Sequence, residues 1–307
     1  MPVREMIQLA RPKHWIKNLL VLMPVVFGLQ MYSAGAWARA VAATVAFCLA
    51  SSFAYIINDI KDRKSDRAHP AKKDRPLASG RVRTKAAVIE AVVLAAASLI
   101  LARSLSFLVT GIISAYLVLQ ILYTVSLKER VLVDVICIAL GFVLRAAAGA
   151  VAIGVVISPW LFICIFTLCL FMGFCKRYSE IVTMGQSAHA GSHRATLLEY
   201  TPELLTHLIT LSAAIGVIAF LLYGLNERTV EQFGTNYFIY VLPVVVYGVC
   251  RFAMLSMKGD YSGPTDIILR DRPFQLTICL WILAILVIIR YGPRLESWIR
   301  STFQQLF

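Results

Sequence analysis

The residues that could most readily do chemistry lie in the stretch Asn58-Asp59-Ile60-Lys61-Asp62-Arg63-Lys64-Ser65-Asp66, which ends a long apolar segment. Asp59, Asp62 and Asp66 are spaced i, i+3 and i+7, so on an α-helix their carboxylates fall on one face. Three like charges on one face repel each other, and a hard divalent cation with oxygen ligands would relieve that repulsion. The sequence therefore predicts a metal site at this helix end.

The alternative is a solvated helix end whose carboxylates pair with basic neighbours in the same stretch, Lys61, Arg63 and Lys64. The clustering of the acids on a single face beside an apolar segment favours the metal interpretation.

The composition indicates which class of protein must position these residues. Of 307 residues, 59% are hydrophobic and only 15% are charged, which excludes a water-soluble domain. Apolar runs of about 20 residues recur along the chain, as is typical of an all-α polytopic membrane protein. The seven cysteines lie inside or at the ends of these runs and show no disulfide or zinc spacing. We expect membrane lipid around the chain, no nucleic-acid partner and no removable signal peptide.

Charge placement predicts the topology. Most of the 30 Lys and Arg residues fall at the N-terminus and after spans two, four, six and eight. The positive-inside rule then puts the N-terminus in the cytoplasm of a multi-pass protein of the plasma or inner membrane. Most acidic residues gather on the same side, which suggests a charged reaction chamber rather than a transport path. The nine expected spans lie near residues 16–31, 37–57, 84–102, 105–125, 131–153, 160–175, 204–224, 236–256 and 273–291.

Two basic segments flank the acidic stretch. In Arg11-Pro12-Lys13-His14-Trp15-Ile16-Lys17-Asn18 we interpret Arg11 and Lys13 as anchors at the membrane interface. Lys17 and Asn18 begin the apolar run, and the interface and the polar chamber are equally good places for them. The loop up to Arg83 is rich in Pro and Gly, which predicts an ordered loop. Its basic residues either determine topology or bind phosphate, and the phosphate candidates are Lys72, Lys73 and Arg75.

Three further elements carry candidate residues. Tyr123 and Lys128 lie in a short connection after the fourth span. Arg145 lies inside the fifth span, where an unpaired charge is costly; it either faces the polar chamber or pairs with Asp134 or Glu90. The small residues at 146–150 should let another helix pack closely beside it. The sixth span ends in Lys176-Arg177-Tyr178-Ser179-Glu180, in which Lys176 and Glu180 could form a mere surface ion pair. His189 and His193 are ordinary loop histidines without a third ligand nearby.

The motif Asn58-Asp59-x-x-Asp62-x-x-x-Asp66, followed by Arg75-Pro76-Leu77-x-x-Gly80, resembles the first aspartate-rich motif of the UbiA superfamily of intramembrane prenyltransferases. The resemblance extends over nearly the whole chain. It implies a single domain of nine transmembrane helices (residues 1–307) around a central cavity that opens to the cytoplasm. It also implies that Asn58, Asp59, Asp62 and Asp66 hold Mg²⁺ and a diphosphate.

Where the usual member of this superfamily has a second group of aspartates, this chain has Lys176-Arg177-Tyr178-Ser179-Glu180. That departure, with Arg11-Pro12-x-x-Trp15-x-Lys17-Asn18, resembles one branch, the decaprenyl-phosphate phosphoribosyltransferases. The branch implies transfer of phosphoribose from 5-phosphoribosyl 1-diphosphate to a polyprenyl phosphate, to make the lipid-linked precursor of arabinofuranose. The extra phosphates call for extra cations. The residues expected to contact substrate are Lys17, Asn58, Lys72, Lys73, Arg75, Tyr123, Lys128, Arg145, Lys176, Arg177, Tyr178 and Glu180.

Two other functions remain open on the sequence. An aromatic prenyltransferase, of the type that prenylates 4-hydroxybenzoate, would share the fold and the first motif. A lipid or solute transporter is disfavoured, because few charges lie at mid-membrane. The polyprenyl chain length and the oligomeric state are open, and a homo-oligomer is compatible with the sequence.

Overall fold

The computed structural model describes residues 3–68, 72–185, 199–259, 261 and 263–306, and within these residues the secondary structure is helical. The described chain forms two compact units, one up to Ile157 and the other from Ser158 onward. His189 and His193 lie outside the described residues.

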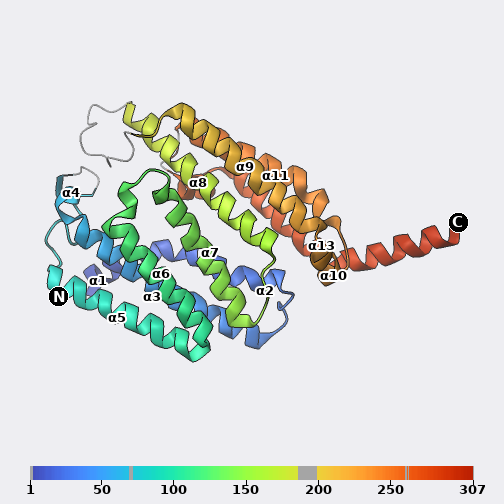
Figure 1. Cartoon of the computed structure of the whole chain (residues 1–307), viewed down its shortest axis with the longest axis horizontal. Helices are drawn as coiled ribbons and strands as arrows, with labels where there is room; N and C mark the ends of the chain where they lie inside the picture. The colour runs from blue at the N-terminus through green and yellow to red at the C-terminus, as the bar shows by residue number, and fades with distance from the viewer. Residues whose placement is uncertain (1–2, 69–71, 186–198, 260, 262, 307) are drawn as a thin grey trace. The chain divides into compact units, whose positions relative to one another are not determined.

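The first unit holds the elements labelled α1 to α7 in Figure 1. In chain order they are α1 (Val3–Ala10), η1 (Pro12–Leu22), α2 (Met23–Phe27), α3 (Ala34–Lys61), α4 (Arg63–Ala68), α5 (Thr84–Leu105), α6 (Phe107–Val125), η2 (Leu127–Glu129) and α7 (Val133–Ile153). The second unit holds α8 (Pro159–Gly185), α9 (Pro202–Leu225), α10 (Glu227–Phe233), η5 (Tyr237–Val241), α11 (Leu242–Lys258), α12 (Pro264–Arg270) and α13 (Arg272–Leu306).

Eight helical segments of the described chain are long and apolar enough to cross a membrane. Six of them agree with expected spans to within four residues at each end. The other two begin where expected but run further, to Val182 rather than 175 and to Trp298 rather than 291. The all-α membrane architecture is therefore confirmed.

The expected first span, near 16–31, has a different structure. It forms an 11-residue 3₁₀ helix followed by a five-residue α-helix, each with a proline at its start. Because a 3₁₀ helix rises by about 2.0 Å per residue, the two pieces laid end to end reach about 30 Å, the thickness of a bilayer core. The ninth crossing stays a prediction.

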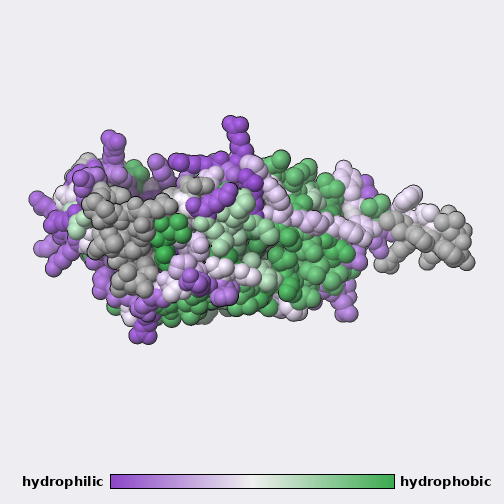
Figure 2. Space-filling view, turned by 90° about the horizontal axis from the view of Figure 1, so that it is seen from above, coloured by the Kyte–Doolittle hydropathy of each residue, from purple (hydrophilic) through white to green (hydrophobic). Residues whose placement is uncertain are grey.

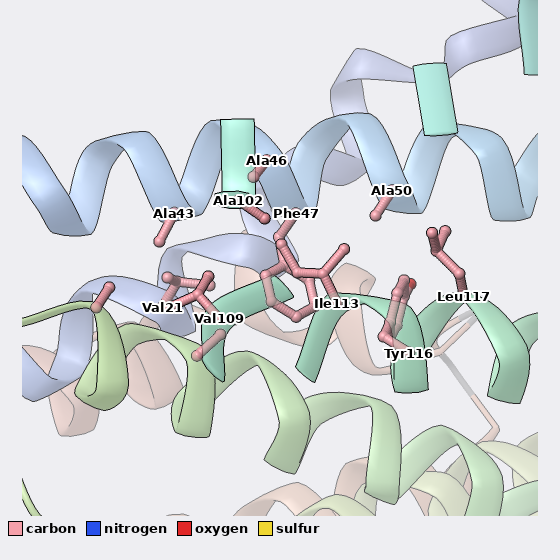
Figure 3. Close-up of a cluster of buried hydrophobic side chains, with 12 residues drawn as sticks. Val21, Ala43, Ala46, Phe47, Ala50, Ala102, Val109, Ile113, Tyr116 and Leu117 are labelled. Atoms are coloured by element: carbon pink, nitrogen blue, oxygen red, sulfur yellow. The ribbon is translucent and has the colours of Figure 1, made fainter. Parts of the chain in front are cut away.

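The core of the first unit is built from alanine, branched aliphatic and aromatic side chains on α3, α5, α6, α7 and η1. Figure 3 shows Ala43, Ala46 and Ala50 along one side of α3, with the ring of Phe47 beside Ile113 of α6. The alanines let neighbouring helices approach closely. Two buried hydroxyls add hydrogen bonds between elements: Ser98 of α5 donates to the Ala46 carbonyl at 2.7 Å, and Ser52 of α3 donates to the Ala10 carbonyl at 2.8 Å.

Gly149 explains how η1 lies against α7. A Cβ atom at this position would meet the Val21 carbonyl oxygen at 2.0 Å, so only glycine permits this backbone contact. The close packing predicted for the small residues at 146–150 is confirmed. It positions η1, with Lys17 and Asn18, beside the helix that carries Arg145.

In the second unit, α8 packs on α9, and α11 packs on α8, α9 and α13. Asp271 precedes α13 and accepts a hydrogen bond from the Phe274 backbone N–H at 2.8 Å, which caps the helix. Its two carboxylate oxygens also accept hydrogen bonds from Arg251 at 2.7 and 2.9 Å. These bonds to the guanidinium lower the pKa of the Asp271 carboxyl below its usual value.

Large apolar side chains remain exposed along most of the long helices. Figure 2 shows hydrophobic residues covering broad areas of the surface, with hydrophilic residues gathered at their margins. Apolar patches of this extent are typical of a surface that faces lipid.

Candidate active site

The acidic stretch lies where α3 ends and α4 begins. Asp62 caps α3, and the backbone hydrogen bonds from Asp62 to Asn58 and from Asp66 to Asp62, at 2.9 and 2.8 Å, keep the turn nearly helical. The Asn58 amide donates to Asp62 Oδ2 at 3.0 Å. Asp59 and Asp66 are buried, whereas Asp62 and Asn58 are half-buried. The helical spacing predicted from the sequence therefore places Asp59 and Asp66 on one side of this turn.

Cationic side chains from three other segments approach these carboxylates. Arg75 Nη1 lies 3.1 Å from Asp59 Oδ1 and 2.7 Å from Asp66 Oδ2, so it bridges the two acids. Arg11 Nη2 lies 2.5 Å from Asp59 Oδ1. Together with Lys128, described next, these two arginines balance the three negative charges of Asp59, Asp62 and Asp66 with three positive ones.

Lys128 completes the cluster from η2. Its side chain is 6% exposed, and Nζ lies 2.5 Å from Asp62 Oδ1 and 3.3 Å from Asn58 Oδ1. A buried ammonium needs such partners, because leaving it unpaired costs several kcal/mol. The sequence predicted Lys128 as a site residue, but not that it pairs with Asp62.

The structure bears on two interpretations of these charges. Among the described residues, the ion pairs of the acids link distant segments, and the alternative pairing with Lys61, Arg63 or Lys64 is not found; Arg63 instead donates to the Thr84 hydroxyl at 2.9 Å. Arg11 is not simply an interfacial anchor, since its guanidinium contacts Asp59. Its backbone adopts the left-handed conformation, with φ 51°, an uncommon state for a residue other than glycine. The only signal in the sequence was its place in the Arg11-Pro12 motif.

The loop that supplies Arg75 is held in place by its own contacts. Arg67 Nε donates to the Ala78 carbonyl at 2.7 Å, Arg81 Nη1 lies 2.9 Å from Glu5 Oε1, and Gly80 adopts φ 80°. Leu77, Ala78 and Val82 are buried. The ordered loop predicted from its Pro and Gly residues is therefore found in the described part, residues 72–83. Of the other phosphate candidates here, Lys72 is half-buried and Lys73 is exposed.

The donor atoms fit magnesium by type. No group of three or more His, Cys, Asp and Glu side chains in the described chain is arranged to hold a metal ion alone. Asn58, Asp59, Asp62 and Asp66 offer only oxygen atoms, which Mg²⁺ prefers. Mg²⁺ in enzymes commonly takes one or two carboxylates and completes its shell with water and substrate phosphates. These side chains therefore fit an ion that binds together with a diphosphate.

Arg145 lies in α7 with 6% of its surface exposed. Its Nε donates to Asn18 Oδ1 at 2.7 Å and its Nη2 to the Tyr116 hydroxyl at 2.9 Å. The guanidinium also lies 4.9 Å from the ring centres of Tyr116 and Phe142. These partners are neutral. Within the described residues Arg145 therefore forms no ion pair with Asp134 or Glu90, the alternative that the sequence left open. Asn18 in turn donates to Ser51 and Cys48 of α3 at 3.1 and 3.3 Å.

The second candidate motif lies on α8 in the other unit. Arg177 is 2% exposed, and its Nη1 lies 2.6 Å from Glu180 Oε2. Lys176 is exposed, with Nζ 3.6 Å from Glu180 Oε1. The ion pair between Lys176 and Glu180 that the sequence allowed is thus present. Glu180 also pairs with Arg177. Tyr178 of α8 and Tyr123 of α6 are half-buried.

Comparison with known proteins identifies the family. The model of the UbiA prenyltransferase family matches residues 21–264. The chain belongs to the UbiA prenyltransferase family. A UbiA homologue from Archaeoglobus fulgidus, solved with GPP and Mg²⁺, superimposes with a TM-score of 0.71 at 20% identity over 93% of this chain and 99% of that chain. This likeness shows that the fold is a UbiA fold.

Two relatives of this UbiA protein are closer in sequence. A protein of Mycolicibacterium smegmatis named decaprenyl-phosphate phosphoribosyltransferase is 33% identical over 291 residues, which cover 91% of each chain. A protein of the same name from Corynebacterium glutamicum is 32% identical over 94% of this chain and 87% of its own length. The similarity thus includes both units and both candidate motifs.

Proposed function

We propose that this UbiA protein transfers 5-phosphoribose from 5-phosphoribosyl 1-diphosphate to a polyprenyl phosphate, releases diphosphate and so makes a lipid-linked precursor of arabinofuranose. The observation that carries the proposal is the similarity, over about nine tenths of the chain, to relatives named decaprenyl-phosphate phosphoribosyltransferase. The aspartate-rich cluster of the first unit and the cations of α8 support it.

In this reaction the bond between C1 of the ribose and the diphosphate oxygen breaks, and an oxygen of the lipid phosphate bonds to C1. Positive charge develops on the sugar while negative charge develops on the departing diphosphate. Arg11, Arg75 and Lys128 contact carboxylates of the aspartate cluster in the structure. We propose that they turn to the diphosphate when it binds, because a phosphate is a strong acceptor for a guanidinium or ammonium.

Asn58, Asp59, Asp62 and Asp66 would hold a magnesium ion, which neutralises charge on the diphosphate when bound. The contacts of these carboxylates with Arg75 and Lys128 offset their negative charge within the cluster. The acceptor needs no general base, since a phosphate monoester with a second pKa of about 6 is largely ionised near neutrality.

Lys176 of α8 supplies a further cation for a substrate phosphate in this proposal, since its side chain is 47% exposed and therefore accessible to one. The ion pair between Arg177 and Glu180 would orient the Lys176 side chain. Further contacts to substrate would come from Tyr178, Tyr123, Lys72 and Lys73. We propose that both units act as one domain in the plasma or inner membrane, with the N-terminus and the cavity opening on the cytoplasmic side.

Mass spectrometry of the lipid product tests the proposal. Detergent-solubilised protein with Mg²⁺ should convert polyprenyl phosphate and 5-phosphoribosyl 1-diphosphate into lipid-linked phosphoribose and diphosphate. It should give no prenylated product from polyprenyl diphosphate and 4-hydroxybenzoate. A prenylated ring without phosphoribosyl transfer would establish instead the aromatic prenyltransferase, which the GPP-bound homologue keeps as the second candidate.

A further inference from the structure

Arg145 carries a positive charge that the described chain does not neutralise locally. The guanidinium has five N–H donors, and its two hydrogen bonds in the described chain go to the neutral Asn18 and Tyr116. Its Nη1 donates to none of the described residues. A Cβ atom at Gly141 would stand 3.5 Å from this Nη1, from Gln120 Nε2 and from Tyr116 Cε2. The absence of a side chain at Gly141 therefore leaves at least a methyl-sized space beside an unused donor.

Lys17 adds a second positive charge nearby. It is half-buried on η1 and directly precedes Asn18, the residue to which Arg145 donates at 2.7 Å. Lys17 forms no hydrogen bond or ion pair with a described residue. Two like charges that repel each other in a mostly buried site are costly unless an anion joins them. The arrangement is complete only with a negatively charged ligand.

The position of this cationic pair separates it from the aspartates. Asn18 links Arg145 to Ser51 and Cys48 of α3, which precede Asp59 by eight and eleven residues. At 1.5 Å per residue these positions lie about 12 to 17 Å from Asp59 along α3, toward the N-terminal end of the helix. A diphosphate at the aspartates could not also fill the space beside Arg145. The anion there must be a different phosphate.

We infer that Lys17 and Arg145 bind a phosphate monoester, and that this phosphate is the head group of the lipid acceptor. The inference rests on the proposed function, because the polyprenyl phosphate is the acceptor in that reaction. The donor offers the same chemistry in its C5 phosphate.

The surroundings favour the lipid over the sugar. Phe47, Tyr116 and Phe142 lie around the guanidinium, with ring centres 4.9 to 5.9 Å away. Of these rings, that of Tyr116 carries a hydroxyl, which already accepts a hydrogen bond from Arg145 at 2.9 Å. The Gln120 amide near Gly141 adds one further polar group, fewer than the several hydroxyls of a ribose need. A displacement also requires the attacking oxygen to approach C1 from the side opposite the diphosphate. A phosphate held about 12 to 17 Å from Asp59 along α3 could approach a ribose that lies between the two sites from that side.

Direct binding to the full-length protein in detergent tests the inference without turnover. The probes are farnesyl phosphate, farnesol and 5-phosphoribosyl 1-diphosphate with Mg²⁺, and the variants are Lys17→Met and Arg145→Met. Each should weaken binding of farnesyl phosphate by at least about tenfold, as expected for loss of a charged hydrogen bond, and leave farnesol and the donor unchanged. Lys13→Met is the matched control, because Lys13 is exposed on the same element. It should bind all three probes as the wild type does.

Three outcomes overturn the inference. Weaker donor binding with intact farnesyl phosphate binding would assign the cations to the C5 phosphate. Intact binding of both would make the charges structural. Equal weakening of farnesol and farnesyl phosphate would mean damage to the hydrocarbon site. Should Arg145→Met fail to fold, Lys17→Met still decides, since it removes no hydrogen bond. If the protein transfers no phosphoribose while both variants lose only farnesyl phosphate, the proposed function falls and this site stands.

Discussion

Each carboxylate of the aspartate cluster already has a cationic partner, and these partners explain how three buried or half-buried acids tolerate one another. Arg75 bridges Asp59 and Asp66, while Lys128 bonds to Asp62. Removing one charge from such a network leaves its partner uncompensated, which costs more than the net contribution of the pair. In the proposed reaction the same cations would turn to the diphosphate, so substrate binding would exchange one anionic partner for another.

Replacement of Asp59 or Asp62 by asparagine should slow turnover severely. The amide keeps the shape of the side chain but loses the charge that binds Mg²⁺ and holds the cations, so we expect kcat to fall by a factor on the order of 10² to 10³. Activity should be measured at limiting Mg²⁺ after purification. Asp74→Asn is the matched control, because Asp74 is an exposed acid of the following loop. Rates like those of the wild type in both site variants would refute the assignment.

The two cations of α8 should behave differently when replaced by alanine. Lys176 is 47% exposed, so Lys176→Ala should weaken substrate binding by about 1.5 to 3 kcal/mol while thermal stability is kept. Arg177 is buried on Glu180, so Arg177→Ala should also lower the melting temperature, since it leaves Glu180 without its closest cation. KM and melting curves of both variants are the measurements. Kinetics indifferent to Lys176→Ala would contradict a phosphate-binding role for this motif.

At the residue scale, the sequence predicted which side chains form the site better than it predicted their partners. The spacing of Asp59, Asp62 and Asp66 follows from helix geometry, which is local. The contacts of Arg11 and Lys128 join residues 48 and 66 positions apart, and no local pattern encodes such distances. Arg11 was missed because a basic residue before an apolar run is most often an anchor.

At the element scale, apolar length located eight spans, and it did not predict that the segment of the expected first span forms a 3₁₀ helix followed by a short α-helix. Hydropathy counts residues, so it cannot distinguish a 3₁₀ helix from an α-helix, although the two rise by different amounts. It also cannot tell which spans are central. More than half of the apolar window of α3 and of α7 is buried, against 11% of that of α13. The helices that carry the aspartates and Arg145 are therefore the ones most enclosed by protein.

The close contact between η1 and α7 should depend on Gly149. Gly149→Ala places a methyl group where the Val21 carbonyl now lies, so we expect a loss of about 1 to 3 kcal/mol of stability as η1 moves away. Because Asn18 is on η1, the hydrogen bond from Arg145 should weaken too, and activity should fall with stability. Gly111→Ala on α6 is the control, since its Cβ atom would meet nothing within 4 Å. Thermal melting in detergent compares the stability of the two variants. Equal melting temperatures for Gly149→Ala and Gly111→Ala would contradict this account of the packing.

At the scale of the whole molecule, the long helices have exposed apolar side chains that suit lipid, and the charged aspartate cluster lies at the end of one of them, α3. Cys250 and Cys279 are exposed on membrane-spanning helices, and the other five cysteines are buried. None of the seven is therefore expected to react with a reagent that cannot cross a membrane. Labelling of a variant with one introduced cysteine should therefore report on that cysteine alone.

Such labelling allows a test of the predicted orientation. Ser79 lies exposed in the loop beside the aspartates, and Ser104 lies exposed at the opposite end of α5. The positive-inside rule places Ser79 in the cytoplasm and Ser104 outside. In spheroplasts, a membrane-impermeant maleimide should label Ser104→Cys directly but Ser79→Cys only after lysis, and the wild type in neither case. The reverse pattern would put the aspartates on the outer side, where the charged diphosphate donor, made in the cytoplasm, could not reach them.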